Sequence, residues 1–136
     1  DSGAKIILAS HMGRPKTDDD RQTLSLEPVA RALGELLSVE VILVEDPTSD
    51  APRELLNNLK QNQLLLLENL RFDPGETKNS HELALQWAKY TDVYINDAFG
   101  ASHRAHASIA EFPSLITDRA YGFLVKKEID FFDLPL

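Results

Sequence analysis

Residues 64–71 read Leu-Leu-Leu-Leu-Glu-Asn-Leu-Arg, and this stretch sets the expected fold class. Four consecutive apolar residues, stopped by Glu68 and Asn69, are typical of a short strand that is covered on both faces. Comparable short apolar runs occur at residues 5–9, 41–44 and 92–96. Strands buried in this way are usual in parallel sheets that have helices on their faces.

The segments between these runs carry helical signals. After Ser25, the expected N-cap, apolar residues recur at helical spacing up to Leu37. We expect further helices over residues 52–59, after the capping-box-like pair Asn79 and Glu82, and over residues 122–132, with residues 97–118 irregular. Alternating strands and helices predict a three-layer, Rossmann-like α/β domain with a mainly parallel sheet.

Composition narrows the class of protein. The chain has 136 residues, which suits one domain, and a formal net charge of −8, which argues against nucleic-acid binding. It has no Cys, so disulfides and cysteine-based zinc sites are excluded, and a cytoplasmic location is allowed. No apolar run approaches the roughly 18 residues of a membrane span, so no membrane partner is expected.

Basic side chains follow three of the four predicted strands. His11 and Arg14 come after the first strand, Arg71 after the third, and His103, Arg104 and His106 after the fourth. Ligands of open parallel sheets bind beyond the carboxyl ends of the strands. Several guanidinium groups at one edge repel each other unless an anion lies among them, and their donor fork matches phosphate oxygens. The pattern therefore predicts a site for a small, phosphorylated anion.

Other interpretations of these residues stay open at this point. An arginine after a strand is usually solvated or half of an ion pair, and Glu68 and Asp97 are near enough to pair with Arg71 and Arg104. The histidines suggest zinc only weakly, because the neighbouring arginines would repel a cation, and we expect no metal. The sequence contains neither G-x-x-x-x-G-K-[ST] nor G-x-G-x-x-G, the usual phosphate loops of nucleotide sites.

Three motifs resemble one known family. Residues 10–15 read S-H-M-G-R-P, residues 66–79 read L-L-E-N-L-R-F-D-P-G-E-T-K-N, and residues 96–108 read N-D-A-F-G-A-S-H-R-A-H-A-S. These segments, in this order, resemble the signature segments of phosphoglycerate kinases, and the resemblance covers essentially the whole chain.

The resemblance implies a glycolytic, cytoplasmic and monomeric enzyme. It would transfer a phosphoryl group reversibly between 1,3-bisphosphoglycerate and ADP, giving 3-phosphoglycerate and ATP. His11, Arg14, Arg71 and Arg104 would bind the phosphoglycerate, while His103 and His106 would belong to the surrounding basic patch. No catalytic residue is assigned to this chain.

The resemblance also implies that residues 1–136 are part of an N-terminal, phosphoglycerate-binding domain. The family's first strand, with its D-x-N-x-P segment, does not precede residue 5. Mg-ATP or Mg-ADP would be bound by a C-terminal domain that is absent, so no cofactor is expected here. We expect an incomplete domain that is inactive alone. The alternatives are a non-catalytic anion-binding module and an isolated folding fragment.

Overall fold

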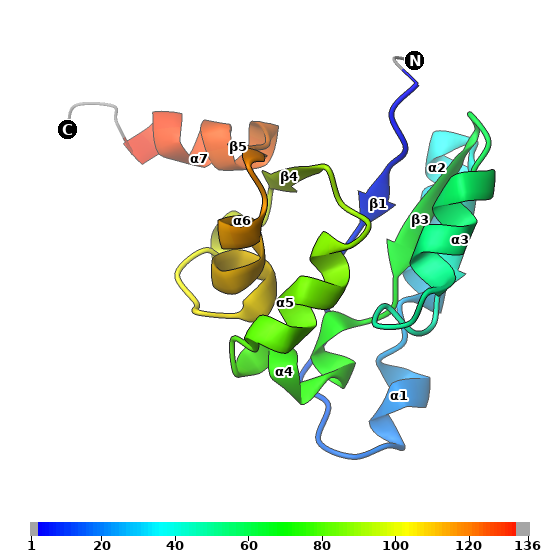
Figure 1. Ribbon diagram of the computed structural model, residues 1–136, viewed down its shortest axis with the longest axis horizontal. Coiled ribbons are helices and arrows are strands. Elements are labelled where there is room, and N and C mark those ends of the chain that lie inside the picture. Colours follow the sequence, from blue (N-terminus) through cyan, green and yellow to red (C-terminus); the bar gives the residue numbers. More distant parts are fainter. Residues whose placement is uncertain (1–2, 133–136) are drawn as a thin grey trace. The chain divides into compact units, whose positions relative to one another are not determined.

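The computed structural model describes residues 3–132, and the chain divides into two compact units, Asp1–Pro74 and Gly75–Leu136 (Figure 1). The first unit contains β1 (Ile7–Leu8), α1 (Asp20–Thr23), α2 (Glu27–Leu37), β2 (Glu40–Val44), α3 (Ala51–Asn58), β3 (Gln63–Leu67) and a 3-10 turn (Leu70–Phe72). From the boundary onward come α4 (Pro74–Thr77), α5 (His81–Ala88), β4 (Val93–Asn96), a 3-10 turn (Phe99–Ala101), a π-helical turn (Ala107–Glu111), α6 (Phe112–Leu115), β5 (Asp118–Tyr121) and α7 (Phe123–Phe132).

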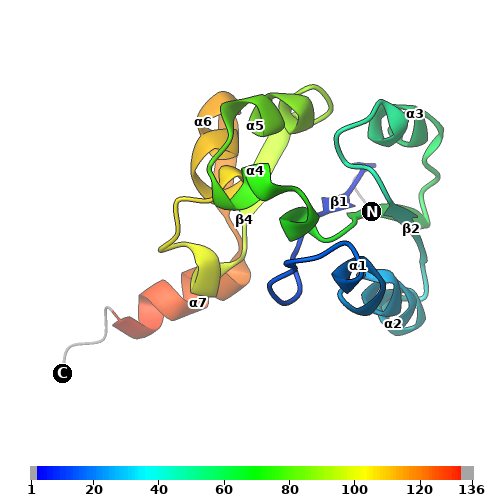
Figure 2. The same cartoon turned by 90° about the horizontal axis from the view of Figure 1, so that it is seen from below.

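The first unit has the predicted three-layer arrangement. Its sheet has the order β1-β3-β2 and is entirely parallel, with Leu65 of β3 in register with Ile7 and Ile42. Figure 2 shows α3 on one side of the strands and α1 and α2 on the other. The central strand β3 is buried from Leu64 to Leu67, as its continuous apolar sequence predicts.

Helix α2 covers this sheet through its apolar stripe. Leu26, Ala30 and Leu66 form the buried centre of the contact, with partly buried residues around them: Leu8, Met12, Val29, Val41 and Leu43. The helix begins at Glu27, and Leu26 rather than Ser25 is the N-cap residue. The Ser25 hydroxyl still accepts a hydrogen bond from the N–H of Glu27 at 3.1 Å, so it satisfies one helix-start donor from the position before the N-cap.

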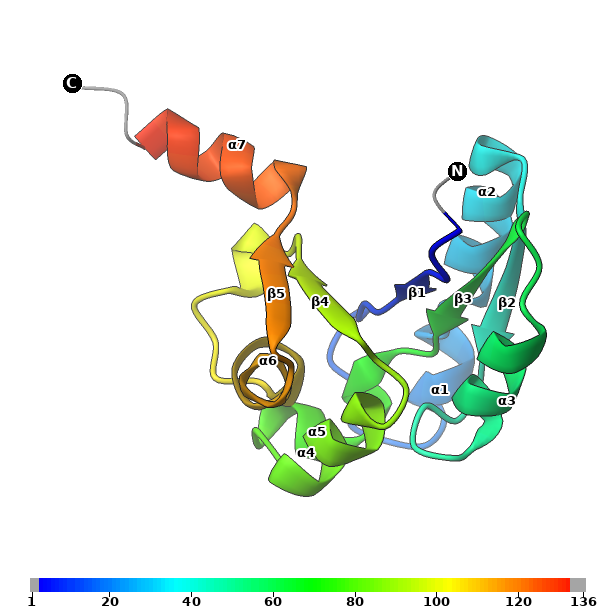
Figure 3. The same cartoon turned by 45° about the horizontal axis from the view of Figure 1, so that its top comes forward.

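The second unit is built around a parallel pair of strands. Figure 3 shows β4 and β5 side by side, with α6 leading into β5 and α7 leaving it. The pairing runs from Val93 opposite Asp118 to Asn96 opposite Tyr121. Helix α5 packs on α6, and the Trp87 ring meets the Phe112 ring edge-on, with centroids 5.7 Å apart. Leu83, Ala84 and Trp87 are buried, as the helical spacing predicts.

The predicted α/β class with parallel strands is confirmed, and two predictions about the sheet and the loops need correction. The strands form two parallel sheets, one in each unit, rather than one. Residues 97–118 are not irregular: they contain the two helical turns, α6 and the first residue of β5. Strand β5 reads Asp-Arg-Ala-Tyr, is exposed throughout and has no apolar alternation, so only its pairing with β4 defines it.

The predicted capping pair of α5 is also wrong. Ser80 is the N-cap of α5, and its hydroxyl accepts a hydrogen bond from the N–H of Leu83 at 3.3 Å. Asn79 has a positive φ of 54° and accepts a hydrogen bond from the N–H of Glu111 at 3.2 Å instead. A serine hydroxyl is as good a cap as an asparagine amide, so the amide of Asn79 is left to serve a distant turn.

Candidate anion-binding site

The loop after β1 carries His11 and Arg14, and both residues are exposed. Gly13 lies between them in the left-handed region, with a φ of 63°. The positive φ favours glycine, and a Cβ atom at this position would lie 2.7 Å from Cδ2 of Leu24, so the leucine side chain would have to shift.

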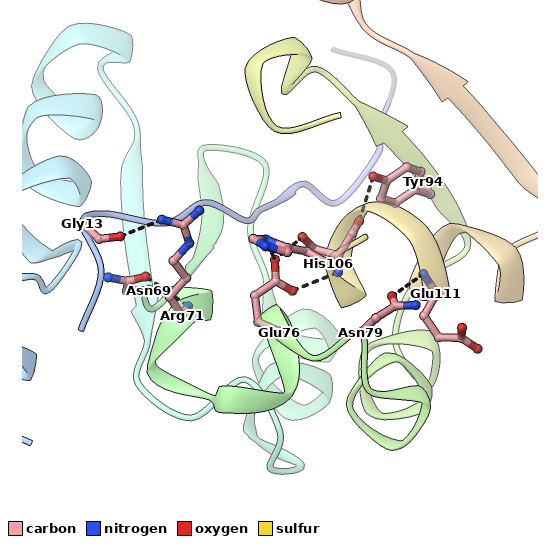
Figure 4. Close-up of polar contacts among 9 residues, drawn as sticks. Gly13, Asn69, Arg71, Glu76, Asn79, Tyr94, His106 and Glu111 are labelled. Carbon is pink, nitrogen blue, oxygen red and sulfur yellow. Dashed lines mark hydrogen bonds and ion pairs between the residues drawn. The ribbon is translucent and has the colours of Figure 1, made fainter. Parts of the chain in front are cut away.

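Arg71 follows β3 and reaches the loop that carries His11 and Arg14. It lies in the 3-10 turn Leu70–Phe72 and is partly buried. Its Nη1 donates a hydrogen bond to the carbonyl of Gly13 at 2.7 Å, as Figure 4 shows. The N–H of Leu70 also donates to the carbonyl of Ser10 at 3.1 Å. The ends of β1 and β3 therefore meet, as the strand-end argument predicts.

Asn69 holds this junction together, a role that was not predicted from the sequence. Its side chain is 2% exposed. Its Nδ2 donates to the carbonyls of Met12 at 2.7 Å and Leu24 at 2.9 Å, and its Oδ1 accepts from the N–H of Arg71 at 3.1 Å. One amide thus fixes the start of the β1 loop, its end and the arginine that follows β3.

Glu68 serves the start of α2. Its carboxylate accepts hydrogen bonds from the hydroxyl of Ser25, the N–H of Leu26 and the N–H of Asn69, each at 2.7 Å. A carboxylate at a helix N-terminus satisfies donors that have no partner within the helix and is stabilised by the helix dipole. These bonds occupy both Glu68 oxygens, and they explain why a carboxylate is buried at this position.

Arg104 and His103 lie in the second unit, on the segment that follows β4. Both are exposed, between the 3-10 turn Phe99–Ala101 and the π-helical turn. The Asp97 carboxylate at the start of the segment accepts from the N–H groups of Leu124 and Val125 at 2.8 and 3.0 Å. Asp97 therefore caps α7, whereas the sequence suggested an ion pair between Asp97 and Arg104.

His106 is much less exposed than its neighbours. Its side chain is 12% exposed, and its Nδ1 lies 3.5 Å from Oε1 of Glu76, whose side chain is 3% exposed. Glu76 also accepts hydrogen bonds from the N–H of Ser108 at 2.9 Å and from the Ser108 hydroxyl at 2.7 Å. Figure 4 shows the Glu76 carboxylate directed at His106.

Tyr94 of β4 closes the same cluster. Its hydroxyl donates to the carbonyl of Ser108 at 2.9 Å. Burial, and to a lesser degree the negative charge of Glu76, raises the pKa of Tyr94 to about 12. The phenol is therefore neutral at physiological pH and can act as a donor.

The six predicted site residues thus divide between the units. His11, Arg14 and Arg71 belong to the first unit, where hydrogen bonds connect their segments, and His103, Arg104 and His106 belong to the second. Over residues 3–132, no group of three His, Cys, Asp or Glu side chains is arranged to hold a metal ion. His81, which is not among the predicted site residues, has its Nδ1 2.6 Å from Oε1 of Glu111.

A cavity of about 330 Å³ in the first unit is a separate feature. It is lined by Arg21, Ser25, Glu27, Leu43, Glu45, Glu68 and Phe72. Three carboxylates face one guanidinium there, so the cavity suits a phosphorylated anion poorly. None of the six predicted site residues lines it.

Parallel strands alternating with helices, present in both units, define an α/β protein. The family model for phosphoglycerate kinase matches residues 1–135, and the chain belongs to that family. Within residues 3–132, no helix is long and apolar enough to cross a membrane.

Relatives agree with this assignment. The chain is 60% identical over 133 residues to a phosphoglycerate kinase of Bdellovibrio bacteriovorus, a match that covers 98% of this chain and 33% of the relative. It is 53% identical over 129 residues to one from Anaeromyxobacter sp. (strain K), covering 94% of this chain and 33% of the relative. The chain therefore spans about a third of the length of the curated relatives that it matches.

Solved structures are similar as well. The phosphoglycerate kinase from Coxiella burnetii has a TM-score of 0.79 at 33% identity, covering 93% of this chain and 31% of that chain. The enzyme from Pyrococcus horikoshii has a TM-score of 0.80 at 34% identity, covering 95% of this chain and 33% of that chain.

Proposed function

We propose that this chain supplies phosphoglycerate-binding residues to a phosphoglycerate kinase of glycolysis. The reaction is reversible phosphoryl transfer between 1,3-bisphosphoglycerate and ADP, giving 3-phosphoglycerate and ATP. The observation that carries the proposal is the hydrogen bond from Arg71 to the carbonyl of Gly13, which places the Arg71 guanidinium at the loop of His11 and Arg14. Membership of the family supplies the substrate class.

The chemistry of phosphoryl transfer suits such residues. The protein contributes mainly positioning and charge neutralisation rather than covalent steps. In this proposal, Arg14, Arg71 and Arg104 bind the phosphate that is not transferred, and His11 adds a donor. His103 and His106 contribute positive potential nearby. Holding one end of the substrate restricts the orientation of the reacting end, which lowers the entropic part of the barrier.

The domain assignment is part of the same proposal. Residues 1–136 form part of an N-terminal phosphoglycerate domain, and Mg-ATP or Mg-ADP is bound by residues outside them. The residues of this chain do not fit a magnesium–nucleotide complex, since the sequence has no phosphate loop and residues 3–132 contain no metal-ligand cluster. A cytoplasmic, monomeric enzyme is proposed, with no nucleic-acid partner. ATP formation by this chain alone would contradict the proposal.

Calorimetric titration with 3-phosphoglycerate tests the binding site. The gene product that contains this chain is compared with its Arg14→Ala and Arg71→Ala variants at low ionic strength, where charge interactions are least screened. Loss of one charge-assisted contact should raise Kd about tenfold or more in each variant. Arg53→Ala is the matched control, because Arg53 is an exposed arginine of α3 in the same unit.

The control variant should bind like the wild type. Circular dichroism checks that the Arg14→Ala and Arg71→Ala variants are folded. Unchanged Kd values in both folded variants would refute the site. A coupled assay for ATP formation by the same gene product then separates the kinase from a non-catalytic anion-binding module. Binding without turnover would favour the module.

A further inference from the structure

The segment that carries Arg104 ends on an unusual helix start. Residues 107–115 continue without a break from a π-helical turn into α6. The N-cap residue of this helix, His106, makes no side-chain capping bond. The first N–H groups of a helix have no partner within it, so this start needs an acceptor from elsewhere in the chain.

Glu76 provides that acceptor from 32 residues away. One oxygen accepts the N–H of Ser108, and the other accepts the Ser108 hydroxyl and faces Nδ1 of His106. Burying a carboxylate is costly unless its oxygens are satisfied. Within residues 3–132, the Glu76 side chain forms its hydrogen bonds and ion pair with Ser108 and His106, so it anchors the chain at this one point.

Two neighbouring contacts restrain the same helix. The Tyr94 hydroxyl donates to the carbonyl of Ser108 at 2.9 Å, and the Asn79 side chain accepts the N–H of Glu111 at 3.2 Å. Arg104 itself is exposed, and only Ala105 separates it from His106. Consecutive Cα atoms are about 3.8 Å apart, so the position of His106 limits where the Arg104 backbone can lie.

We infer that Glu76 is a positioning residue for Arg104. By fixing the end of the segment at residues 106–108, it presents the Arg104 guanidinium to the anion without touching the anion itself. The inference rests on the proposed function, because it assumes that Arg104 binds phosphoglycerate. A purely structural role for Glu76 makes a different prediction, since it would reduce the amount of folded protein without changing the affinity of each folded molecule.

Calorimetry with 3-phosphoglycerate separates these two roles, because stoichiometry reports the binding-competent fraction and Kd reports the site. In the gene product, Glu76→Ala should raise Kd about tenfold, within the usual range for coupled neighbours. Glu76→Gln should raise it less, since its amide can still accept from the N–H of Ser108 and donate to the Ser108 hydroxyl. It also keeps the proposal testable if the alanine variant does not fold.

Glu111→Gln is the matched control. It is the same carboxylate-to-amide change, made within the helix whose start Glu76 caps, but the Oε1 of Glu111 pairs with the exposed His81. Its Kd should equal that of the wild type. Wild-type Kd values in both Glu76 variants, with or without a lower stoichiometry, would overturn the inference and leave Glu76 a stabilising residue only.

A double-mutant cycle with Arg104→Ala tests whether Glu76 acts through Arg104. In the Arg104→Ala background, Glu76→Ala should change Kd by less than about twofold, because coupled residues are non-additive. Full, independent effects of the two substitutions would overturn the inference. If Arg104→Ala alone leaves Kd unchanged, Arg104 does not contact the ligand and that part of the proposed function fails. If Arg104→Ala raises Kd but the Glu76 substitutions do not, only the inference about Glu76 fails.

Discussion

Asn69→Asp tests the junction between the β1 loop and Arg71 directly. The substitution keeps the shape of the side chain but removes both Nδ2 donors. The carbonyls of Met12 and Leu24, now 2.7 and 2.9 Å from that nitrogen, would face a carboxylate oxygen instead. The acceptor for the N–H of Arg71 is retained, so the change is confined to the two loop contacts.

The size of the effect follows from those contacts. Losing a buried hydrogen bond and leaving its partner unsatisfied costs about 1–3 kcal/mol. Two such losses, at a side chain that is 2% exposed, give a decrease in the free energy of unfolding of about 2–6 kcal/mol. The total stability of a domain is about 5–15 kcal/mol, so the first unit should be severely weakened. With a urea m-value of about 1 kcal/mol/M, the midpoint should fall by about 2 M or more.

Urea unfolding followed by far-ultraviolet circular dichroism measures this decrease. Asn58→Asp is the control, because the exposed Asn58 side chain donates only to the carbonyl of Glu54 on its own helix. It should cost less than about 1 kcal/mol. A wild-type midpoint for Asn69→Asp would refute the reasoning.

Acid adds a second check on the same variant. Burial raises the pKa of the introduced carboxyl above its unfolded value, so the destabilisation grows as the pH rises through the unfolded pKa. Protonation restores one donor, and the difference from the wild type at the same pH should therefore be smaller at about pH 4 than at about pH 7. A defect that stays constant over this range would contradict the proposed cause.

Three further outcomes are expected. Gly13→Ala should lower the free energy of unfolding by at least about 1 kcal/mol, because its φ of 63° disfavours a side chain and the Leu24 side chain occupies the space. Thermal unfolding measures this loss, with Gly100→Ala as the control because the space at Gly100 is open. Stability should fall as the pH rises from the unfolded tyrosine value of about 10 to the folded Tyr94 value of about 12, since the unfolded chain loses that proton first; Tyr94→Phe should remove this part of the alkaline loss, and it should also remove a late step from the phenolate absorbance titration. Asp97→Ala should reduce helicity and cost about 1 kcal/mol by uncapping α7.

The strands and the basic side chains were predictable because their signals are local. The run Leu64–Leu67 identifies a buried strand by composition alone, and Arg71 follows it within a few residues. The general rule for parallel sheets then places that arginine at the same edge as the loop after β1. The hydrogen bond between Arg71 and Gly13 agrees with that rule.

The buried polar residues were not predictable in the same way. Asn69, Glu76 and Asp97 contact partners 57, 32 and 27 residues away, so no local pattern shows what they bind. Strand β5 has the same difficulty, because its sequence is polar and its pairing with β4 alone defines it. The only sequence signal for these carboxylates and amides was their presence in the family motifs.

The contacts of residues 68–79 limit where new chain termini can be introduced into this protein. Glu68 and Asn69 bind segments of the first unit, while Glu76 and Asn79 bind segments of the second. New termini introduced by circular permutation between these positions would break anchors in both units at once. Residues 16–19 and 60–62 are exposed, and exposed loops are where chain breaks and insertions are best tolerated. A split or permuted form of the protein should therefore be opened at those loops.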